Sequence, residues 1–154
     1  IYITLVIGDI KEDLIETRYT FKREYSRKTK IYYQKVISEK GKSKTLFHKI
    51  KTYYYNNQPY TLLYVRILTG QQHQIRASLL HLGYPIVKDT KYGVIYNSKE
   101  DKIFTRLFLH STYYKIGKEE IYCRLTDDLI EILKILKEKN IEKIISKKII
   151  ESIF

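Results

Sequence analysis

A β-hairpin over residues 44–68 is the feature that most constrains what this chain can fold into. Between residues 60 and 68 the side chains alternate as in a strand with two distinct faces, and one face collects Leu63, Val65 and Ile67. The Asn-Asn-Gln-Pro segment at residues 56–59 predicts a turn, because these residue types favour tight reversals. The stretch before it ends in three tyrosines and predicts the partner strand. The sequence therefore predicts an antiparallel pair of strands near the middle of the chain.

A helix is predicted directly after this hairpin. Thr69 and Gln72 have the spacing of a capping box, which places the start of the helix near Thr69. Apolar residues at i, i+4 and i+7 predict one buried stripe, formed by Ile75, Leu79 and Leu82. Gly83 and Pro85 predict the end of the helix, since neither residue type continues one.

The rest of the chain predicts further strands, with more helices near the end. Expected strands cover residues 1–8, 15–37, 85–88, 107–116 and 120–125. Expected turns and loops cover residues 9–14, 38–43, 92–93 and 94–105. Thr126 predicts the start of a helix that Asn140 interrupts, and residues 141–149 predict a final helix. The expected fold class is α+β, with a mixed, largely antiparallel sheet and a few helices.

Length and composition limit the class of protein. A chain of 154 residues fits one domain, because a single core commonly serves about 100–200 residues. With 44% hydrophobic and 30% charged residues, it has the composition of a folded protein. No apolar run approaches the ~20 residues that span a bilayer, so no membrane helix is expected. Cys123 is the one cysteine, which excludes an internal disulfide framework; we expect it to be a small core residue.

Positive charge is concentrated in one part of the sequence. The net charge is +12, and residues 22–51 contain eleven basic and two acidic residues, which leaves +3 for the rest of the chain. A coding bias toward lysine would explain the total charge, but concentration in one segment favours binding to nucleic acid. Tyrosines are interleaved with these charges. The candidate nucleic-acid contacts are Lys28, Lys30, Lys42 and Lys44.

Common catalytic motifs are absent from the sequence. It has no P-loop, no nucleophile elbow, no dinucleotide-binding fingerprint and no zinc-protease motif. His73 and His81 lie two turns apart on the predicted helix, but a metal site needs a third ligand. The histidines are therefore expected to be ordinary polar residues, and no metal site is predicted.

Arg76 is the most informative charged residue of the predicted helix. It follows Ile75 and so projects at the edge of the buried stripe, where an unpaired charge would be costly. We therefore expect Arg76 to have a partner. From the residues alone, a functional arginine, a structural salt bridge and a surface arginine with a buried stem all remain open.

The segment from residue 69 to residue 93, TGQQHQIRASLLHLGYPIVKDTKYG, resembles the signature of RluA-type RNA pseudouridine synthases. That signature runs Thr-Gly-Arg-Thr/Ser-His-Gln-Ile/Leu-Arg-x-His, then Leu-Gly-His-Pro-Ile-x-Gly-Asp-x-x-Tyr-Gly. The matching residues are Thr69, Gly70, His73, Gln74, Ile75, Arg76, Leu82, Gly83, Pro85, Ile86, Asp89, Tyr92 and Gly93. Weaker matches elsewhere, which extend the resemblance to nearly the whole chain, are Tyr2, Val6 and Gly8, then Arg106, Leu109 and His110, then Leu125, Asp128 and Leu129.

The resemblance implies the function and the roles of individual residues. Such enzymes detach uracil from its ribose, turn it and reattach it through carbon 5, without metal or organic cofactor. It implies that Tyr2 stacks on the base and takes the proton from carbon 5, and that Arg76 holds the catalytic aspartate in its charged form. Ile75 and Leu109 would be apolar walls of the pocket, with His73 and Gln74 beside them. The implied partner is RNA, either ribosomal or transfer RNA.

The sequence also departs from the family pattern. The family's catalytic aspartate lies in a His-Arg-Leu-Asp motif upstream of the tyrosine strand, and this sequence has no such motif. Gln71 and Lys88 replace a family arginine and glycine. Because the chain starts at Ile1 and has no methionine, we expect residues 1–154 to be the C-terminal portion of one catalytic domain. The N-terminal portion would carry the nucleophile, and this chain alone would have no turnover.

Two alternatives to an active synthase remain open: a catalytically inactive RNA-binding module with the same fold, and a plain basic scaffold fragment. The expected location is intracellular, in the cytoplasm or an organelle, and the expected state is a monomer.

Overall fold

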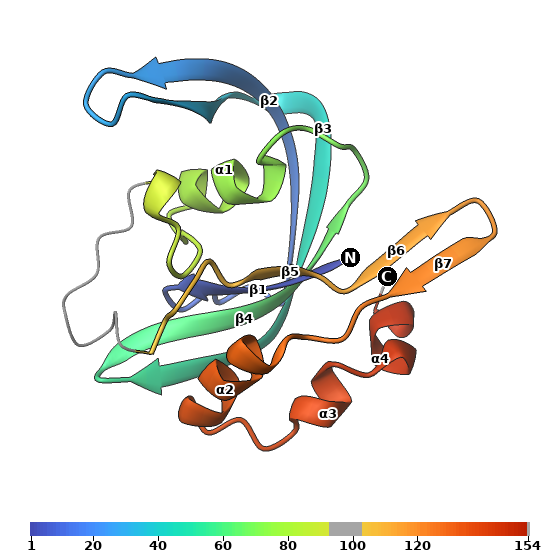
Figure 1. The fold of residues 1–154 in the computed structure, drawn as a ribbon. Helices are drawn as coiled ribbons and strands as arrows, with labels where there is room; N and C mark the ends of the chain where they lie inside the picture. The colour runs from blue at the N-terminus through green and yellow to red at the C-terminus, as the bar shows by residue number, and fades with distance from the viewer. Residues whose placement is uncertain (93–102, 154) are drawn as a thin grey trace.

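A five-stranded antiparallel sheet forms the centre of the computed structural model, which describes residues 1–92 and 103–153 (Figure 1). Its strand order is β2-β3-β4-β1-β5, with β1 Tyr2–Ile7, β2 Leu14–Ser26, β3 Ile31–Tyr55, β4 Gln58–Ile67 and β5 Leu109–Ser111. Strands β6 Tyr113–Ile116 and β7 Glu119–Tyr122 form a separate hairpin. The described helices are α1 Gln74–His81, the 3₁₀ turn η1 Thr90–Tyr92, α2 Asp127–Ile135, α3 Ile141–Ile144 and α4 Lys147–Ser152. The predicted α+β class is confirmed.

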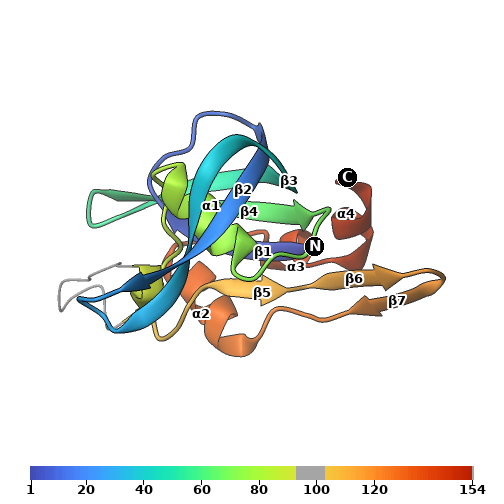
Figure 2. The same cartoon turned by 90° about the horizontal axis from the view of Figure 1, so that it is seen from above.

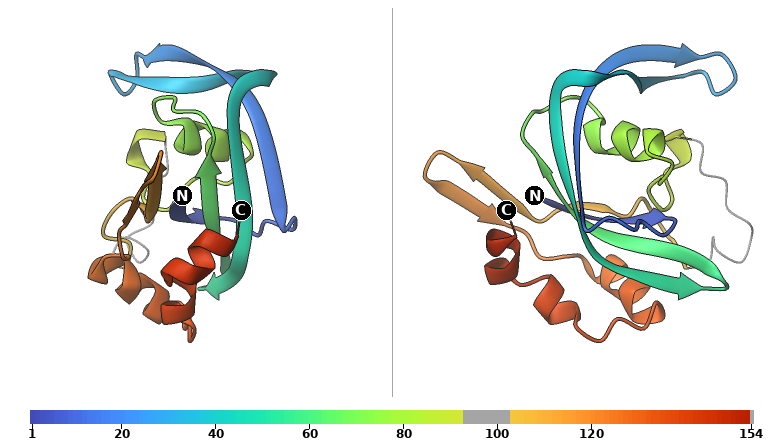
Figure 3. Two further views of the ribbon diagram at one scale, coloured as in Figure 1. Left: turned by 90° about the vertical axis from the view of Figure 1, so that its right-hand side faces the viewer. Right: turned by 180° about the vertical axis from the view of Figure 1, so that it is seen from behind.

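Helices cover both faces of the sheet (Figures 1 and 3). Helix α1 lies on one face, over a cluster that includes Val6, Phe47 and Leu63. Helices α2, α3 and α4 pack on the other face, over a larger cluster that includes Ile3 and Leu5. Because successive residues of β1 and β4 point to opposite faces, both strands are buried on both sides.

The predicted hairpin at residues 44–68 is confirmed. Strands β3 and β4 are antiparallel, and Tyr55 pairs with Gln58 across a two-residue turn. The two turn residues, Asn56 and Asn57, have φ angles of 49° and 63°. Asparagine tolerates this left-handed conformation better than most residues. A two-residue turn with positive φ at both residues has a twist that matches the twist of the two strands.

The turn predicted at residues 38–43 is wrong. These residues lie within β3, and the chain reverses earlier, at residues 27–30. Strand pairing slips between Tyr19 and Phe21, which marks an irregularity in the β2–β3 ladder. A Cβ atom on Gly41 would lie 2.0 Å from the backbone carbon of Tyr19, so only glycine allows this close approach. The polar, glycine-containing segment at residues 38–43 thus corresponds to an irregularity within a strand and not to a turn.

Beyond this irregularity, the outer halves of β2 and β3 form an arm, residues 19–39, that curls over α1 (Figures 1 and 2). Two contacts with His81 hold the base of the arm against the helix. The ring of Tyr19 meets the His81 ring edge-on at 5.2 Å between centroids, and Glu39 Oε1 lies 2.9 Å from His81 Nε2. The arm and α1 therefore face each other on the same side of the sheet.

The capping box predicted at Thr69 and Gln72 is also wrong, because α1 begins later, at Gln74. The Thr69 hydroxyl accepts a hydrogen bond from the Lys44 backbone N–H at 3.0 Å and donates one to Gln74 Oε1 at 3.1 Å. The Thr69 side chain thus ties the loop to β3 instead of capping the helix. At the other end, the predicted stop is confirmed: Gly83 follows α1 with φ of 85°.

Other elements differ from the predictions in detail. Residues 85–88 run beside β1 with a single Val6–Ile86 bridge, so they form no full strand. The predicted strand over residues 107–116 is divided into β5 and β6, and the final helix into α3 and α4. Cys123 is exposed, so its predicted core position is wrong. The turn at residues 92–93 and the loop at residues 94–105 fall largely outside the described residues. In the described part of the chain, no helix has the length and apolar character needed to span a membrane.

Candidate active site

A cavity of about 280 Å³ opens between the start of β1 and the start of α1. Its lining includes all six side chains that the resemblance assigns to the pocket or to catalysis: Tyr2, His73, Gln74, Ile75, Arg76 and Leu109. Ile67, Gln71 and Leu107 complete the lining, and sequence reasoning missed these three. We call this space the Tyr2–Arg76 cavity.

The walls of the Tyr2–Arg76 cavity are mainly apolar. Tyr2 begins β1 and is held between Val65 of β4 and Ser111 of β5. Ile75 is buried in the first turn of α1 and contributes to the cluster beneath that helix, against which Tyr2 and Leu109 also pack. An aromatic ring next to aliphatic walls makes a surface that suits a flat heterocyclic base.

Arg76 has a partner, as expected, and the partner is Asp89. Arg76 Nε lies 2.8 Å from Asp89 Oδ2 and Nη2 lies 2.6 Å from Oδ1, a two-point geometry. The Asp89 side chain is only 1% exposed, and its Oδ1 also accepts the backbone N–H of Tyr92 at 3.2 Å. Among residues 1–92 and 103–153, Arg76 Nη1 has no hydrogen-bond partner. One edge of the guanidinium is therefore fixed, and the other is open to a second anion.

His73 lies at the start of α1 with φ of 53°. Its Nδ1 is 3.2 Å from the Tyr92 hydroxyl. Burial lowers the pKa of His73, and the positive charges of Arg76 and Lys91 lower it further. The imidazole is therefore neutral at neutral pH. Within residues 1–92 and 103–153, no cluster of three or more histidine, cysteine or acidic side chains is placed to hold a metal ion.

Gln74 reaches the cavity, but its amide serves the fold. Its Nε2 donates to the Lys44 carbonyl at 3.1 Å and to the Thr45 hydroxyl at 2.9 Å. Its Oε1 accepts from the Gln71 N–H at 3.0 Å and from the Thr69 hydroxyl. With both donors and both acceptor sites in use, Gln74 fixes the loop that carries His73.

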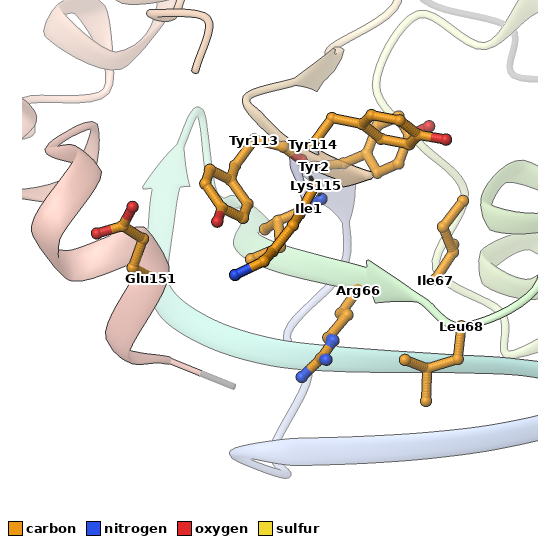
Figure 4. A pocket seen from close by; sticks show the side chains of 9 residues that line it. All are labelled: Ile1, Tyr2, Arg66, Ile67, Leu68, Tyr113, Tyr114, Lys115 and Glu151. Atoms are coloured by element: carbon orange, nitrogen blue, oxygen red, sulfur yellow. Dashed lines mark hydrogen bonds between the residues drawn. The ribbon is translucent and has the colours of Figure 1, made fainter. Parts of the chain in front are cut away.

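A second cavity of about 440 Å³ lies beside the first and shares Tyr2 and Ile67 with it (Figure 4). Its other lining residues are Ile1, Arg66, Leu68, Tyr113, Tyr114, Lys115 and Glu151. Tyr2 therefore forms part of the wall of two adjoining spaces.

The four candidate RNA contacts do not form one cluster. Lys28 and Lys30 lie in the exposed turn at the tip of the arm, whereas Lys42 and Lys44 lie near its base. Lys42 is exposed, but Lys44 is partly buried and its Nζ is 3.0 Å from Glu16. This lysine is the largest cause of the lowered pKa of Glu16. Lys44 thus has an acidic partner, which it shares with Arg18.

Two later segments that carry weaker family matches meet in space. Arg106 Nε lies 2.5 Å from Asp128 Oδ2, and its Nη2 donates to the Thr126 hydroxyl at 2.7 Å. Arg106, with help from Thr126, lowers the pKa of Asp128 to about 2. The pair joins the start of α2 to the segment that leads into β5.

Sequence reasoning included Asp89 and Tyr92 among the family matches but gave them no role. The missing signal was geometric, because the segment after Gly83 has no periodicity that would show which way its side chains point. A buried acidic residue shortly after a helix with an edge arginine would have been the clue.

Comparison with known proteins finds relatives of one family. The profile of the RNA pseudouridylate synthase family matches residues 1–81. Ribosomal large subunit pseudouridine synthase C of Buchnera aphidicola subsp. Baizongia pistaciae is 38% identical over 113 residues, which cover 71% of this chain and 34% of that protein. Synthase D of Haemophilus influenzae is 32% identical over 117 residues, which cover 66% of this chain and 35% of that protein. The chain thus spans about a third of the length of these relatives.

A solved structure has the same fold. Human RNA pseudouridylate synthase domain containing 1 superposes with a TM-score of 0.64 over 90% of this chain and 65% of its own, at 22% identity. The family profile covers more than half of the chain, and the segment it matches includes Tyr2, His73 and Arg76. The chain therefore belongs to the RNA pseudouridylate synthase family, among its RluA-like members.

Proposed function

We propose that the natural protein containing this chain isomerises uridine to pseudouridine in RNA, and that the Tyr2–Arg76 cavity receives the target base. The observation that carries this proposal is the convergence of the six side chains on one cavity from β1, α1 and β5. These residues are up to 107 positions apart in the sequence, between Tyr2 and Leu109.

In this proposal Tyr2 provides the surface on which the extruded base stacks. A base must leave the RNA helix before its glycosidic bond can react, and an aromatic ring compensates the lost stacking. The bond from ribose C1′ to N1 breaks, the base turns, and C1′ bonds to C5. The base leaves C1′ as an anion, so the proton that C5 loses must end on N1. The Tyr2 oxygen takes the proton from C5 as it releases its own hydroxyl proton, and N1 of the product ends protonated. Ile75 and Leu109 keep water from the reacting atoms.

Arg76 holds the nucleophilic carboxylate in its ionised form. A carboxylate beside apolar walls needs a fixed cation to stay charged, and the open Nη1 edge of Arg76 is suited to this task. Asp89 is no candidate for the nucleophile, because its side chain is buried and both oxygens are engaged. Asp89 instead fixes the guanidinium. The nucleophile is the aspartate of the His-Arg-Leu-Asp motif, which this sequence lacks.

Ribosomal RNA is the proposed substrate, with transfer RNA as the alternative. Two of the relatives are named as ribosomal large subunit pseudouridine synthases. The basic arm would contact phosphates outside the cavity, where contacts position the RNA without reading its sequence.

The test uses the natural protein that contains this chain, with RNA labelled with tritium at C5 of uridine. We expect tritium release from the unmodified protein. Tyr2→Phe retains the stacking ring but lacks the hydroxyl, so it should abolish release while RNA affinity changes less than about threefold, because phosphate contacts dominate binding.

Two outcomes would contradict this assignment. RNA binding by the unmodified protein without any tritium release would favour the inactive RNA-binding module. Equal losses of affinity and turnover in Tyr2→Phe would instead give Tyr2 a purely structural role.

A further inference from the structure

Tyr92 connects three parts of the molecule that are far apart in the sequence. It ends η1 and is buried, with its ring beneath the Arg76 guanidinium at 5.0 Å from Cζ to the ring centroid. Its backbone N–H donates to Asp89 Oδ1, the oxygen that also accepts Arg76 Nη2. Arg76 is thus held from below by the ring of Tyr92 and from the side by a carboxylate that Tyr92 helps to orient.

The hydroxyl of Tyr92 reaches the arm. The backbone N–H of Gln34, in the β3 half of the arm, donates to the Tyr92 hydroxyl at 3.1 Å. The neighbouring Tyr33 ring meets the Tyr92 ring edge-on, with 6.5 Å between centroids. This hydrogen bond joins the arm to a residue that contacts both Arg76 and Asp89.

Donor and acceptor roles at this hydroxyl follow from its partners. A backbone N–H can only donate, so the Tyr92 oxygen accepts from Gln34. Among residues 1–92 and 103–153, His73 Nδ1, 3.2 Å away, is the one acceptor within hydrogen-bonding distance of the Tyr92 hydroxyl proton. The arrangement that satisfies this proton therefore has neutral His73 accepting at Nδ1 and carrying its own proton at Nε2. The position of the arm is in this way linked to the tautomer of a residue that lines the cavity.

We propose that Tyr92 is a positioning residue that couples docking of the arm on RNA to the alignment of Arg76 and His73 in the Tyr2–Arg76 cavity. The inference rests on the proposed function. When the arm lies against α1, Gln34 holds the Tyr92 hydroxyl, the tyrosine ring lies under Arg76, and His73 has one fixed tautomer. When the arm lifts, the hydroxyl loses its donor, and both cavity residues lose an orienting contact. Docking on RNA would thus prepare the site for chemistry.

Tyr92→Phe tests this coupling, because it keeps the ring under Arg76 and against Tyr33 while it removes only the hydroxyl. We expect kcat to fall about tenfold, the effect of one lost hydrogen bond, while KM for RNA changes less than twofold. Hydrogen exchange at the Gln34 amide should become faster by at least the same factor. The ¹⁵N shifts of His73 should lose the signature of a single Nε2–H tautomer.

Tyr64→Phe is the matched control. It removes a buried tyrosine hydroxyl that donates to the Ile144 carbonyl at 2.6 Å, on the opposite face of the sheet. This control should leave kcat, Gln34 exchange and the His73 spectrum unchanged.

The outcomes separate this inference from the proposed function. If the unmodified protein forms pseudouridine, and Tyr92→Phe leaves kcat, Gln34 exchange or the His73 tautomer unchanged, the coupling is wrong. If the unmodified protein forms no pseudouridine, the proposed function fails, and the exchange and ¹⁵N readouts still decide whether Tyr92 links the arm to the cavity.

Discussion

The guanidinium of Arg76 is the residue-scale feature on which the site depends most. Its two hydrogen bonds with Asp89 fix the plane of the guanidinium, and the ring of Tyr92 lies beneath that plane. Both partners come from the segment that follows α1, so Arg76 is already oriented while the arm lies against α1. A side chain preorganised in this way loses little conformational entropy when it engages a second carboxylate.

Replacement of Arg76 by lysine should therefore fail to preserve activity. Lysine is a point charge on a flexible stem and cannot bond Asp89 at two points while it faces another carboxylate. We expect tritium release in Arg76→Lys to fall by about 10–100-fold, as for the loss of one or two charge-assisted hydrogen bonds. Arg76→Ala should also lower the free energy of unfolding by about 3–5 kcal/mol, because the buried Asp89 carboxylate loses its cation.

Chemical denaturation and the tritium assay, run on both Arg76 variants, check the two effects separately. Near-normal turnover in Arg76→Ala would refute the assignment of Arg76 to the active site. An unchanged unfolding free energy would show that Asp89 finds another partner.

Residue-scale predictions from the sequence succeeded where a physical rule applied to one position. The need of a half-buried charge for a partner predicted that Arg76 is paired. The identity of the partner could not be predicted, because Asp89 lies after a glycine-terminated helix in a segment without regular periodicity. Ile67, Gln71 and Leu107 are not among the six positions that the resemblance assigned to the cavity. They line it because segments that are far apart in the sequence meet there, which local patterns do not show.

At the scale of elements, the arm is the part that the sequence described least well. An exposed turn and an irregularity within an exposed strand both favour polar residues and a glycine. The composition of residues 38–43 therefore could not show which of the two is present. The distinction lies in the partner strand, where Tyr19 approaches Gly41 too closely for any side chain. The hairpin at residues 44–68 was predictable, because two asparagines and two alternating strands are all local signals.

The arm gives a more specific prediction for RNA binding than the charge of the segment alone. Lys28 and Lys30 are exposed at its tip, whereas Lys44 is paired with Glu16 at its base. Each phosphate contact contributes ~0.7–0.9 to the slope of log affinity against log salt concentration. Neutralising Lys28 and Lys30 together should therefore make this slope shallower by about 1.4–1.8. Lys44→Gln, the matched control, should change this slope much less.

Binding isotherms at several salt concentrations measure these slopes, with several unrelated RNAs. Binding of all the RNAs should be weakened alike, because the tip lysines contact phosphates and read no base sequence. A tip variant with the slope of the unmodified protein would mean that the lysines are only a solvated surface.

At the scale of the whole molecule, the sheet separates two apolar clusters. The cluster under α1 supports the Tyr2–Arg76 cavity, and the larger cluster under α2–α4 supports the fold. The fold class followed from the order of strand and helix patterns, but the strand order did not. Placing β1 between β4 and β5 depends on pairing across more than 100 residues, which no local pattern encodes.

Leu129 offers a test of how independent the two clusters are. It is fully buried in α2, so Leu129→Ala should lower the free energy of unfolding by about 2–5 kcal/mol through lost burial and a cavity. Below the melting temperature, RNA affinity and turnover should be unchanged. Leu80→Ala on α1, where the side chain is 40% exposed, should cost less than about 1 kcal/mol. Loss of turnover in fully folded Leu129→Ala would show that the clusters are coupled.

A sheet with a separate cluster on each side also affects how such a sequence can diverge. The segment from α2 to α4 supplies five buried isoleucines to the larger cluster, Ile130, Ile132, Ile144, Ile145 and Ile150. Aliphatic side chains exchange with one another at small cost when total volume is kept. A coding bias toward isoleucine can therefore change many residues on this side of the sheet at small cost in stability. Selection for catalysis would act on the few cavity residues on the other side. In this family member, mutational pressure and enzymatic constraint would act on opposite faces of the same strands.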